Sequence, residues 1–166
     1  MSKITKILYA TDLSASAKAA FKWAMSLAEQ YDASITVIHV IPDLTEEMSA
    51  SAGYDLAAHF GADRLAEFNE EGRANAFTAV RERIQNVCTE MEKDFSKCRT
   101  NLNNIIIKVG HPVRNIITAA EEGGYDIVVL GTHGHGLIGD LMLGSVARGV
   151  VHKCSIPVLT VRLPPE

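Results

Sequence analysis

The sequence predicts an α/β fold in which helices cover both faces of a parallel sheet. Short apolar runs alternate with helical patterns along nearly the whole chain, which calls for right-handed crossovers between parallel strands. The strand runs are almost continuously apolar, as expected of strands buried on both faces. The length of 166 residues is that of one domain, so we expect a single domain over 1–166.

Two strands and the helix between them are predicted at the start of the chain. The apolar run Lys6–Ala10 is typical of a buried strand. The segment 17–30 places its apolar residues at helical spacing, and either Ser14 or Ser16 is available as its N-cap. The β-branched run 35–41 predicts the second strand. Together these segments form a first strand-helix-strand unit.

The middle of the chain changes in character. The acidic segment 43–61 is predicted to be an exposed loop insertion with some helical turns. A long amphipathic pattern over 65–95 predicts a helix that Gly72 loosens or splits near its start. The third strand is expected at 105–109, where the residues form another apolar run.

The last third of the chain completes the alternation. Pro112 suits the first turn of a helix that a glycine pair ends. A fourth strand is predicted at 127–130, a short helix at Ser145–Lys153, and a fifth strand at 157–162. The sheet therefore has five predicted strands.

Ligands of such sheets bind beyond the carboxyl ends of the strands, where the strand order reverses. Three segments follow strand ends of this kind: Thr11 with Asp12, then 41–42, and the glycine-rich segment 131–144. Asp12 could accept a hydrogen bond from such a ligand. Alternatively, it could form an Asx turn or cap the following helix.

The glycine-rich segment contains a literal GxGxxG match, but it comes late in the chain and lacks the acidic residue that follows a dinucleotide fingerprint. The sequence has no GxxxxGK[ST] motif, which excludes a P-loop NTPase. Gly144 and Ser145 open a helix whose free N–H groups suit an anion, with Ser145 as a good N-cap. Gly131 and Gly134 could let the backbone wrap a phosphate, or these glycines could serve only as turns.

At this segment the chain resembles the universal stress protein family, in its ATP-binding branch. Gly131, Gly134, Gly144 and Ser145 match the family pattern of G, two residues, G, nine residues, G and then S or T. Segments KILYATDLS, VIHVIP, VGHP, YDIVVLGTHG and SIPVLTVR are also similar, so the likeness covers nearly the whole chain apart from 43–61. It implies a three-layer sandwich with a Rossmann-like, adenine nucleotide alpha hydrolase-like fold and strand order 3-2-1-4-5.

The resemblance also implies a binding site for an adenine nucleotide, ATP or else AMP or ADP, together with Mg²⁺. Thr11 and Asp12 would lie near the adenine or the ribose, and Val40 would give backbone contacts to the adenine. The ribose and phosphates would be held by Gly131, Gly134, Gly144, Ser145 and Val146. His135 is expected near the phosphate as a hydrogen-bond donor. A homodimer through strand 157–162 is implied as well, and an edge strand with unpaired backbone groups fits that role.

The predicted function is therefore nucleotide binding with a regulatory role in a stress response and an unnamed protein partner. We expect no catalytic residues, because no nucleophile–base pair is visible, and thus little or no catalysis. The alternatives are a weak ATPase or other hydrolase on the same scaffold, and a nucleotide-free dimeric interaction protein. His133 and His135 could suggest a metal pair, but no third ligand is evident.

The composition limits the setting in which the protein acts. The net charge of −4 gives no basic footprint for nucleic acid. No apolar run is long enough for a signal peptide or a membrane span. The 3 cysteines form no CxxC pair and are expected to be reduced, mostly buried thiols, so we expect a cytoplasmic protein.

Overall fold

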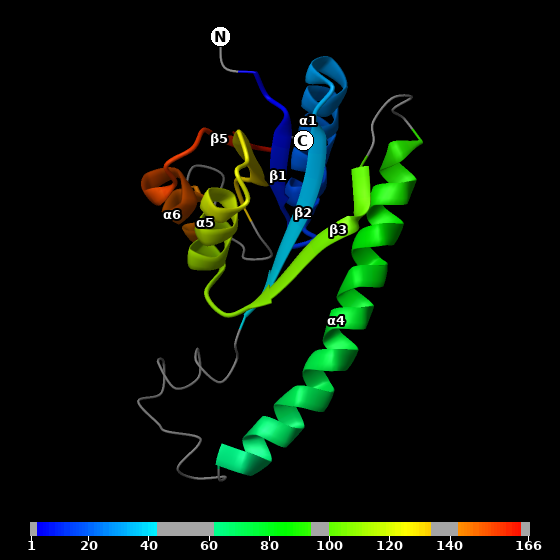
Figure 1. Cartoon of the computed structure of the whole chain (residues 1–166), viewed down its shortest axis with the longest axis vertical. Helices are drawn as coiled ribbons and strands as arrows, with labels where there is room; N and C mark the ends of the chain where they lie inside the picture. The colour runs from blue at the N-terminus through cyan, green and yellow to red at the C-terminus, as the bar shows by residue number, and fades with distance from the viewer. Residues whose placement is uncertain (1–2, 43–61, 94–99, 134–142, 164–166) are drawn as a thin grey trace.

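The computed structural model describes residues 3–42, 62–93, 100–133 and 143–163, which form alternating strands and helices (Figure 1). The elements in chain order are β1 (Lys6–Ala10), α1 (Ala15–Tyr31), β2 (Ser34–Ile41), α4 (Ala62–Glu92), β3 (Thr100–Val109), α5 (Pro112–Glu122), β4 (Ile127–Gly131), α6 (Ser145–Lys153) and β5 (Val158–Val161). All four strand pairings are parallel, in the order β3-β2-β1-β4-β5. The predicted fold class and strand order are confirmed, whereas the loop prediction for 43–61 lies outside the described residues.

Alternate residues of the central strands face opposite layers of the molecule. On β1, Ile7 and Tyr9 belong to the core that α1 and α4 cover, whereas Leu8 and Ala10 belong to the core that α5 and α6 cover. Figure 1 shows α5 and α6 together on one side of the sheet and α4 along the other. Burial on both faces explains why the strands lack the polar alternation of a half-exposed sheet.

Several element boundaries differ from the predictions. Of the two candidate N-caps, Ser14 caps α1, because its Oγ accepts a hydrogen bond of 3.2 Å from the Ala17 amide. The predicted split at Gly72 is wrong, since α4 runs through this residue without a break. A single glycine costs a helix about 1 kcal/mol, which the good helix formers around it offset. β3 begins at Thr100, ahead of the expected 105, in a polar stretch that has no apolar pattern.

The carboxylate of Asp126 anchors the start of β1. Asp126 Oδ2 accepts hydrogen bonds from the Thr5 amide at 2.7 Å, the Thr5 hydroxyl at 2.8 Å and the Lys6 amide at 2.9 Å. These bonds, the one from the Thr5 amide first, hold the pKa of Asp126 below its usual value. The start of β1 is thereby tied to the residue that precedes β4.

Gly149 allows α5 and α6 to approach each other closely. A Cβ atom at this position would lie 2.8 Å from Val113 Cγ2 and 3.0 Å from Val113 Cγ1. The glycine of the last helix, which the sequence pattern alone did not explain, therefore has a packing role.

Among the described residues, none of the helices combines the length and the apolar character needed to cross a bilayer.

Candidate functional site

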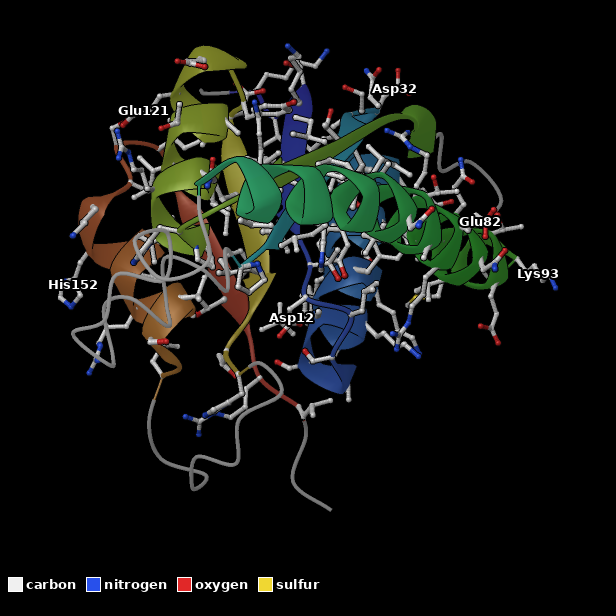
Figure 2. The ribbon with its side chains drawn as sticks, turned by 90° about the horizontal axis from the view of Figure 1, so that it is seen from below. Asp12, Asp32, Glu82, Lys93, Glu121 and His152 are labelled. Carbon is white, nitrogen blue, oxygen red and sulfur yellow. The ribbon has the colours of Figure 1, made fainter. Side chains whose placement is uncertain are left out.

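A cavity of about 510 Å³ opens at the carboxyl ends of β1, β2 and β4. The chain builds the sheet outward from β1 to β2 and β3, and then returns to place β4 and β5 on the other side of β1. The cavity therefore lies where the strand order reverses, the position at which sheets of this kind bind ligands. Figure 2 views this edge of the sheet, with Asp12 beside the start of α1.

The structure brings together residues that are far apart in the sequence. Seven of the nine predicted site residues line this cavity: Thr11, Asp12, Val40, Gly131, Gly144, Ser145 and Val146. The other two, Gly134 and His135, lie outside the described residues. The gathering of the seven in one cavity is a property of the fold, whereas their role in binding stays a prediction.

The turn from β1 to α1 is shaped by its own side chains. Thr11 Oγ1 accepts a hydrogen bond of 3.0 Å from the Leu13 amide, and Asp12 Oδ1 accepts one of 3.0 Å from the Ser14 amide. Leu13 has a φ of 66°, a left-handed conformation that non-glycine residues seldom adopt. Asp12 thus forms the Asx turn that was one of its two predicted roles, and it also lines the cavity.

The first turn of α6 presents backbone donors at the cavity. Gly144 is the N-cap and offers no side-chain hydrogen bond, so the prediction of Ser145 as the cap is wrong, and Ser145 is the first helical residue. The first main-chain bond of the helix runs from the Arg148 amide to the Gly144 carbonyl at 2.9 Å. The amides of 145–147 therefore have no acceptor within the helix. All three residues line the cavity, where the helix N-terminus favours an anion.

Gly131 has a packing role that the sequence did not reveal. A Cβ atom there would lie 2.7 Å from the Ser16 carbonyl carbon and 2.9 Å from the Ala17 amide nitrogen. Because backbone atoms cannot move aside as a side chain does, β4 and α1 meet this closely only with glycine at this position. The φ of Gly131 is not left-handed, so the residue does not form the proposed phosphate nest through that conformation.

The remaining walls of the cavity are largely apolar. Ile38, Leu130, Ile116 and Ala147 belong to the core beneath α5 and α6, and they also line the cavity. The contribution of α5 was missed in the sequence, although Pro112 follows the end of β3 closely and its helix covers this face of the sheet. An apolar wall with a few polar groups is the usual composition of a small-molecule site.

Two histidines also line the cavity. The side chain of His39, near the end of β2, is partly buried, and its Nδ1 donates a hydrogen bond of 2.7 Å to the Thr11 carbonyl. His133 Nδ1 lies 2.9 Å from the hydroxyl of Thr132, a buried residue that the sequence reading missed. His133 Nε2 is buried and has no hydrogen-bond partner among the described residues.

Within the described ranges, no group of three or more His, Cys, Asp or Glu side chains is arranged to hold a metal ion. The metal-pair reading of His133 and His135 includes a residue that lies outside those ranges. Figure 2 shows His152 pointing outward from α6, away from this edge.

Comparison with known proteins identifies similar sequences over nearly the full chain. The profile described as "Universal stress protein family" matches residues 3–162. Universal stress protein MJ0577 from Methanocaldococcus jannaschii is 30% identical over 164 residues, which cover 95% of this chain and 94% of that protein. Universal stress protein Sll1388 from Synechocystis is 29% identical over 157 residues, which cover 95% and 97% of the two chains.

Solved structures have the same architecture. The structure of MJ0577 superposes with a TM-score of 0.76 at 27% identity and covers 99% of this chain and 100% of that one. A universal stress protein solved in complex with cAMP has a TM-score of 0.60 at 20% identity, with 97% and 98% coverage, and it shows the likeness of the fold.

Proposed function

Because the chain belongs to the universal stress protein family, we propose that it binds an adenine nucleotide in the cavity at the carboxyl ends of β1, β2 and β4. The ligand is ATP, ADP or AMP, and binding has a regulatory role in a stress response, in the cytoplasm, with little or no catalysis. The observation that carries this proposal is the gathering of seven predicted nucleotide-contacting residues around one cavity of about 510 Å³.

The two ends of the cavity suit the two ends of a nucleotide. The apolar side chains of Ile38, Val40 and Ile116 offer a surface for the base. The carboxylate of Asp12 is placed to accept a hydrogen bond from a ribose hydroxyl. The free amides at the start of α6, and the positive end of its dipole, suit a phosphate.

We propose that Mg²⁺ binds together with the nucleotide and not to the protein alone. Proteins bind Mg²⁺ through one or two carboxylates together with substrate phosphates. Asp12 is the carboxylate that lines the described part of the cavity, so it is the residue that fits this role. The ion would neutralise part of the phosphate charge.

The universal stress protein solved with cAMP supports the choice of ligand class. That protein holds an adenine nucleotide on the same architecture. The present chain has its cavity at the position where this architecture favours ligands, at the reversal of strand order.

The proposal is tested by the nucleotide that accompanies the purified protein and by the stability that added nucleotide confers. The protein is denatured, its supernatant is separated by ion exchange, and thermal unfolding is followed with and without adenine nucleotides. A ligand at 100 times its Kd raises the free energy of unfolding by about 2.7 kcal/mol, and we expect the unfolding temperature to rise accordingly. Asp12→Ala should reduce the shift, whereas the exposed Glu82→Gln on α4 serves as the control.

Absence of any copurified adenine nucleotide, together with no thermal shift from millimolar ligand, would contradict the proposal. Release of inorganic phosphate from ATP is measured in parallel. A rate above that of buffer which disappears in Asp12→Ala would favour the weak ATPase instead.

We also propose that the chain forms a homodimer through its last strand. β5 is the edge of the sheet and pairs only with β4 among the described strands. Its outer backbone groups are available for antiparallel pairing with the same strand of a second copy.

A further inference from the structure

Resting on the proposed function, we infer that the cavity is built for an adenine nucleotide with a single phosphate group, and that a free triphosphate binds it less tightly. The reason is electrostatic, because the chain places its lysines and arginines away from the described walls of the cavity.

The strand ends and turns that form most of the cavity contain no lysine or arginine in the sequence. Between Lys6 and Lys18, over the end of β1 and the turn that follows, there is no lysine or arginine. The same is true between Arg114 and Arg148, a stretch that includes β4, all of the glycine-rich segment and the start of α6. It is true again from 23 to 63, which includes all of β2.

The cations nearest to these segments along the chain do not line the cavity. Arg114 on α5 and Arg148 on α6 are both exposed, and neither contributes to the walls. Lys108 is opposite Val40 in the register between β3 and β2, but it too is exposed and outside the lining. Among the described residues, the charged side chain that does line the cavity is the carboxylate of Asp12.

The two imidazoles of the described walls each have one ring nitrogen engaged by the protein. His39 Nδ1 is engaged by the Thr11 carbonyl, and His133 Nδ1 by the hydroxyl of Thr132. Among the described groups, the donors left for a phosphate are the backbone amides at the start of α6 and His133 Nε2, which is buried without a partner among the described residues. A helix N-terminus carries roughly half a positive charge, which suits one phosphate group.

A triphosphate places a larger demand on the site. Each further phosphate adds negative charge that has to be neutralised, and nucleotide sites for triphosphates do so with lysine, arginine and bound Mg²⁺. Here the described walls offer backbone amides, two imidazoles and a carboxylate, but no lysine or arginine. A nucleoside monophosphate or its cyclic form thus matches the site by itself, whereas a triphosphate needs its charge reduced first.

Titration calorimetry with adenosine, AMP and ATP, each in EDTA and in Mg²⁺, tests the inference. We expect AMP to bind about tenfold tighter than adenosine, and ATP in EDTA to bind at least about tenfold more weakly than AMP. Mg²⁺ should restore ATP binding and leave AMP binding unchanged. Metal-free ATP that binds as tightly as AMP would overturn the inference, and so would equal affinities for AMP and adenosine. No binding of any of the three would refute the proposed function itself.

A gain-of-charge variant tests the cause directly. Ser145 is exposed at the first position of α6 and lines the cavity, so Ser145→Lys adds a cation at the phosphate end. Ser145→Gln is the neutral control of similar reach. We expect the lysine variant to raise the affinity for metal-free ATP about tenfold relative to the glutamine variant, with a smaller gain for AMP. Equal affinities in the two variants would show that charge does not limit binding.

Arg148→Gln removes the cation of α6 that is nearest in sequence to the cavity lining. We expect this variant to leave the ratio of AMP to ATP affinity unchanged, because the Arg148 side chain is exposed and outside the cavity lining. A selective loss of ATP binding in Arg148→Gln would place this guanidinium in the site and overturn the inference.

Discussion

The backbone amide of Gly144 donates a hydrogen bond of 2.8 Å to the carbonyl oxygen of Thr132. This bond joins the residue after β4 to the N-cap of α6 and so holds the two ends of the glycine-rich segment together. We call this pair of residues, Thr132 and Gly144, the neck of the segment. The same end of β4 is held from the other side, where the Thr132 amide donates to the Val161 carbonyl at 2.9 Å. The first turn of α6 is thereby positioned over the cavity by the sheet itself.

Gly144→Ala is expected to weaken both the fold and nucleotide binding. The added Cβ would lie 2.9 Å from the Thr132 carbonyl oxygen, so the neck must open. Overpacking of this kind costs about 1–3 kcal/mol. Urea unfolding measures the loss of stability, and calorimetry with AMP measures the loss of affinity.

Gly124→Ala is the matched control for this variant. Gly124 has a φ of 62° and no neighbouring atom within 4 Å of an added Cβ, so its substitution strains only the backbone, by roughly 1–2 kcal/mol. It lies at the end of α5 and outside the cavity lining. If both variants lose affinity equally, the neck has no special role in binding.

Gly149→Ala is expected to destabilise the contact between α5 and α6. Its Cβ would meet the side chain of Val113, at a cost of about 1–3 kcal/mol in the free energy of unfolding. Because the obstacle is a side chain, Val113→Ala should relieve it, with a coupling energy of about 1–2 kcal/mol in a double-mutant cycle. Ile84→Val, in the core on the opposite face, should be additive with Gly149→Ala.

Asp126→Asn is expected to destabilise the protein in a pH-dependent way. The hydrogen bonds from Thr5 and Lys6 lower the pKa of Asp126 in the folded state relative to the unfolded chain. The stabilisation is therefore complete above the unfolded-state pKa and is lost as the pH falls through the folded-state pKa. Urea midpoints of the two proteins should differ at neutral pH and converge in acid. A difference that persists at low pH would mean that the carboxylate charge is not its source.

The fluorescence of Trp23 is expected to report on formation of the proposed dimer. Trp23 is the single tryptophan of the chain, and 57% of its surface is exposed. The Ser16 hydroxyl donates a hydrogen bond of 3.3 Å to the Val161 carbonyl of β5. Trp23 is seven residues after Ser16, almost two helical turns farther along the same side of α1, so it is on the side of the helix that meets β5. We therefore expect the Trp23 emission to shift to shorter wavelength as the protein concentration rises through the dimer Kd.

Thr160→Pro is the variant that separates dimerisation from folding. The carbonyls of Pro157 and Val161 accept bonds from β4, so the alternation of the strand directs the Thr160 amide toward the open edge. Proline is tolerated in an edge strand where its missing amide faces outward. We expect this variant to be monomeric by light scattering, with an emission that no longer depends on concentration. A wild-type protein that is monomeric at tens of micromolar would refute the dimer.

The sequence was sufficient for the alternation of elements and for the position of the cavity. Buried parallel strands leave continuous apolar runs, and the carboxyl ends of such strands meet at one edge, so Thr11 and Gly131 were expected to be near each other. The strand order came from the family resemblance, because periodicity alone does not say which strands are neighbours. The structure and the relatives confirm the fold and the family.

Features that depend on contacts between distant segments were not predictable in the same way. The start of β3 at Thr100 has no apolar pattern, and its pairing with Ile35 is visible only in the assembled sheet. The place of α5 in the cavity wall depends on its contact with β2, an element from which α4 and β3 separate it in the sequence. Local propensity carries no information on either point.

The contact between Gly131 and the first turn of α1 changes what a match to the glycine pattern means. This glycine is required by a helix that precedes it by most of the length of the chain, so a relative that had lost its ligand would still retain it in order to fold. A search for the glycine pattern therefore finds proteins that share this packing contact, whether or not they bind a nucleotide. Ser145 is exposed at the cavity and makes no such packing contact in the first turn of α6, so it is the position at which loss of binding would first become visible among relatives.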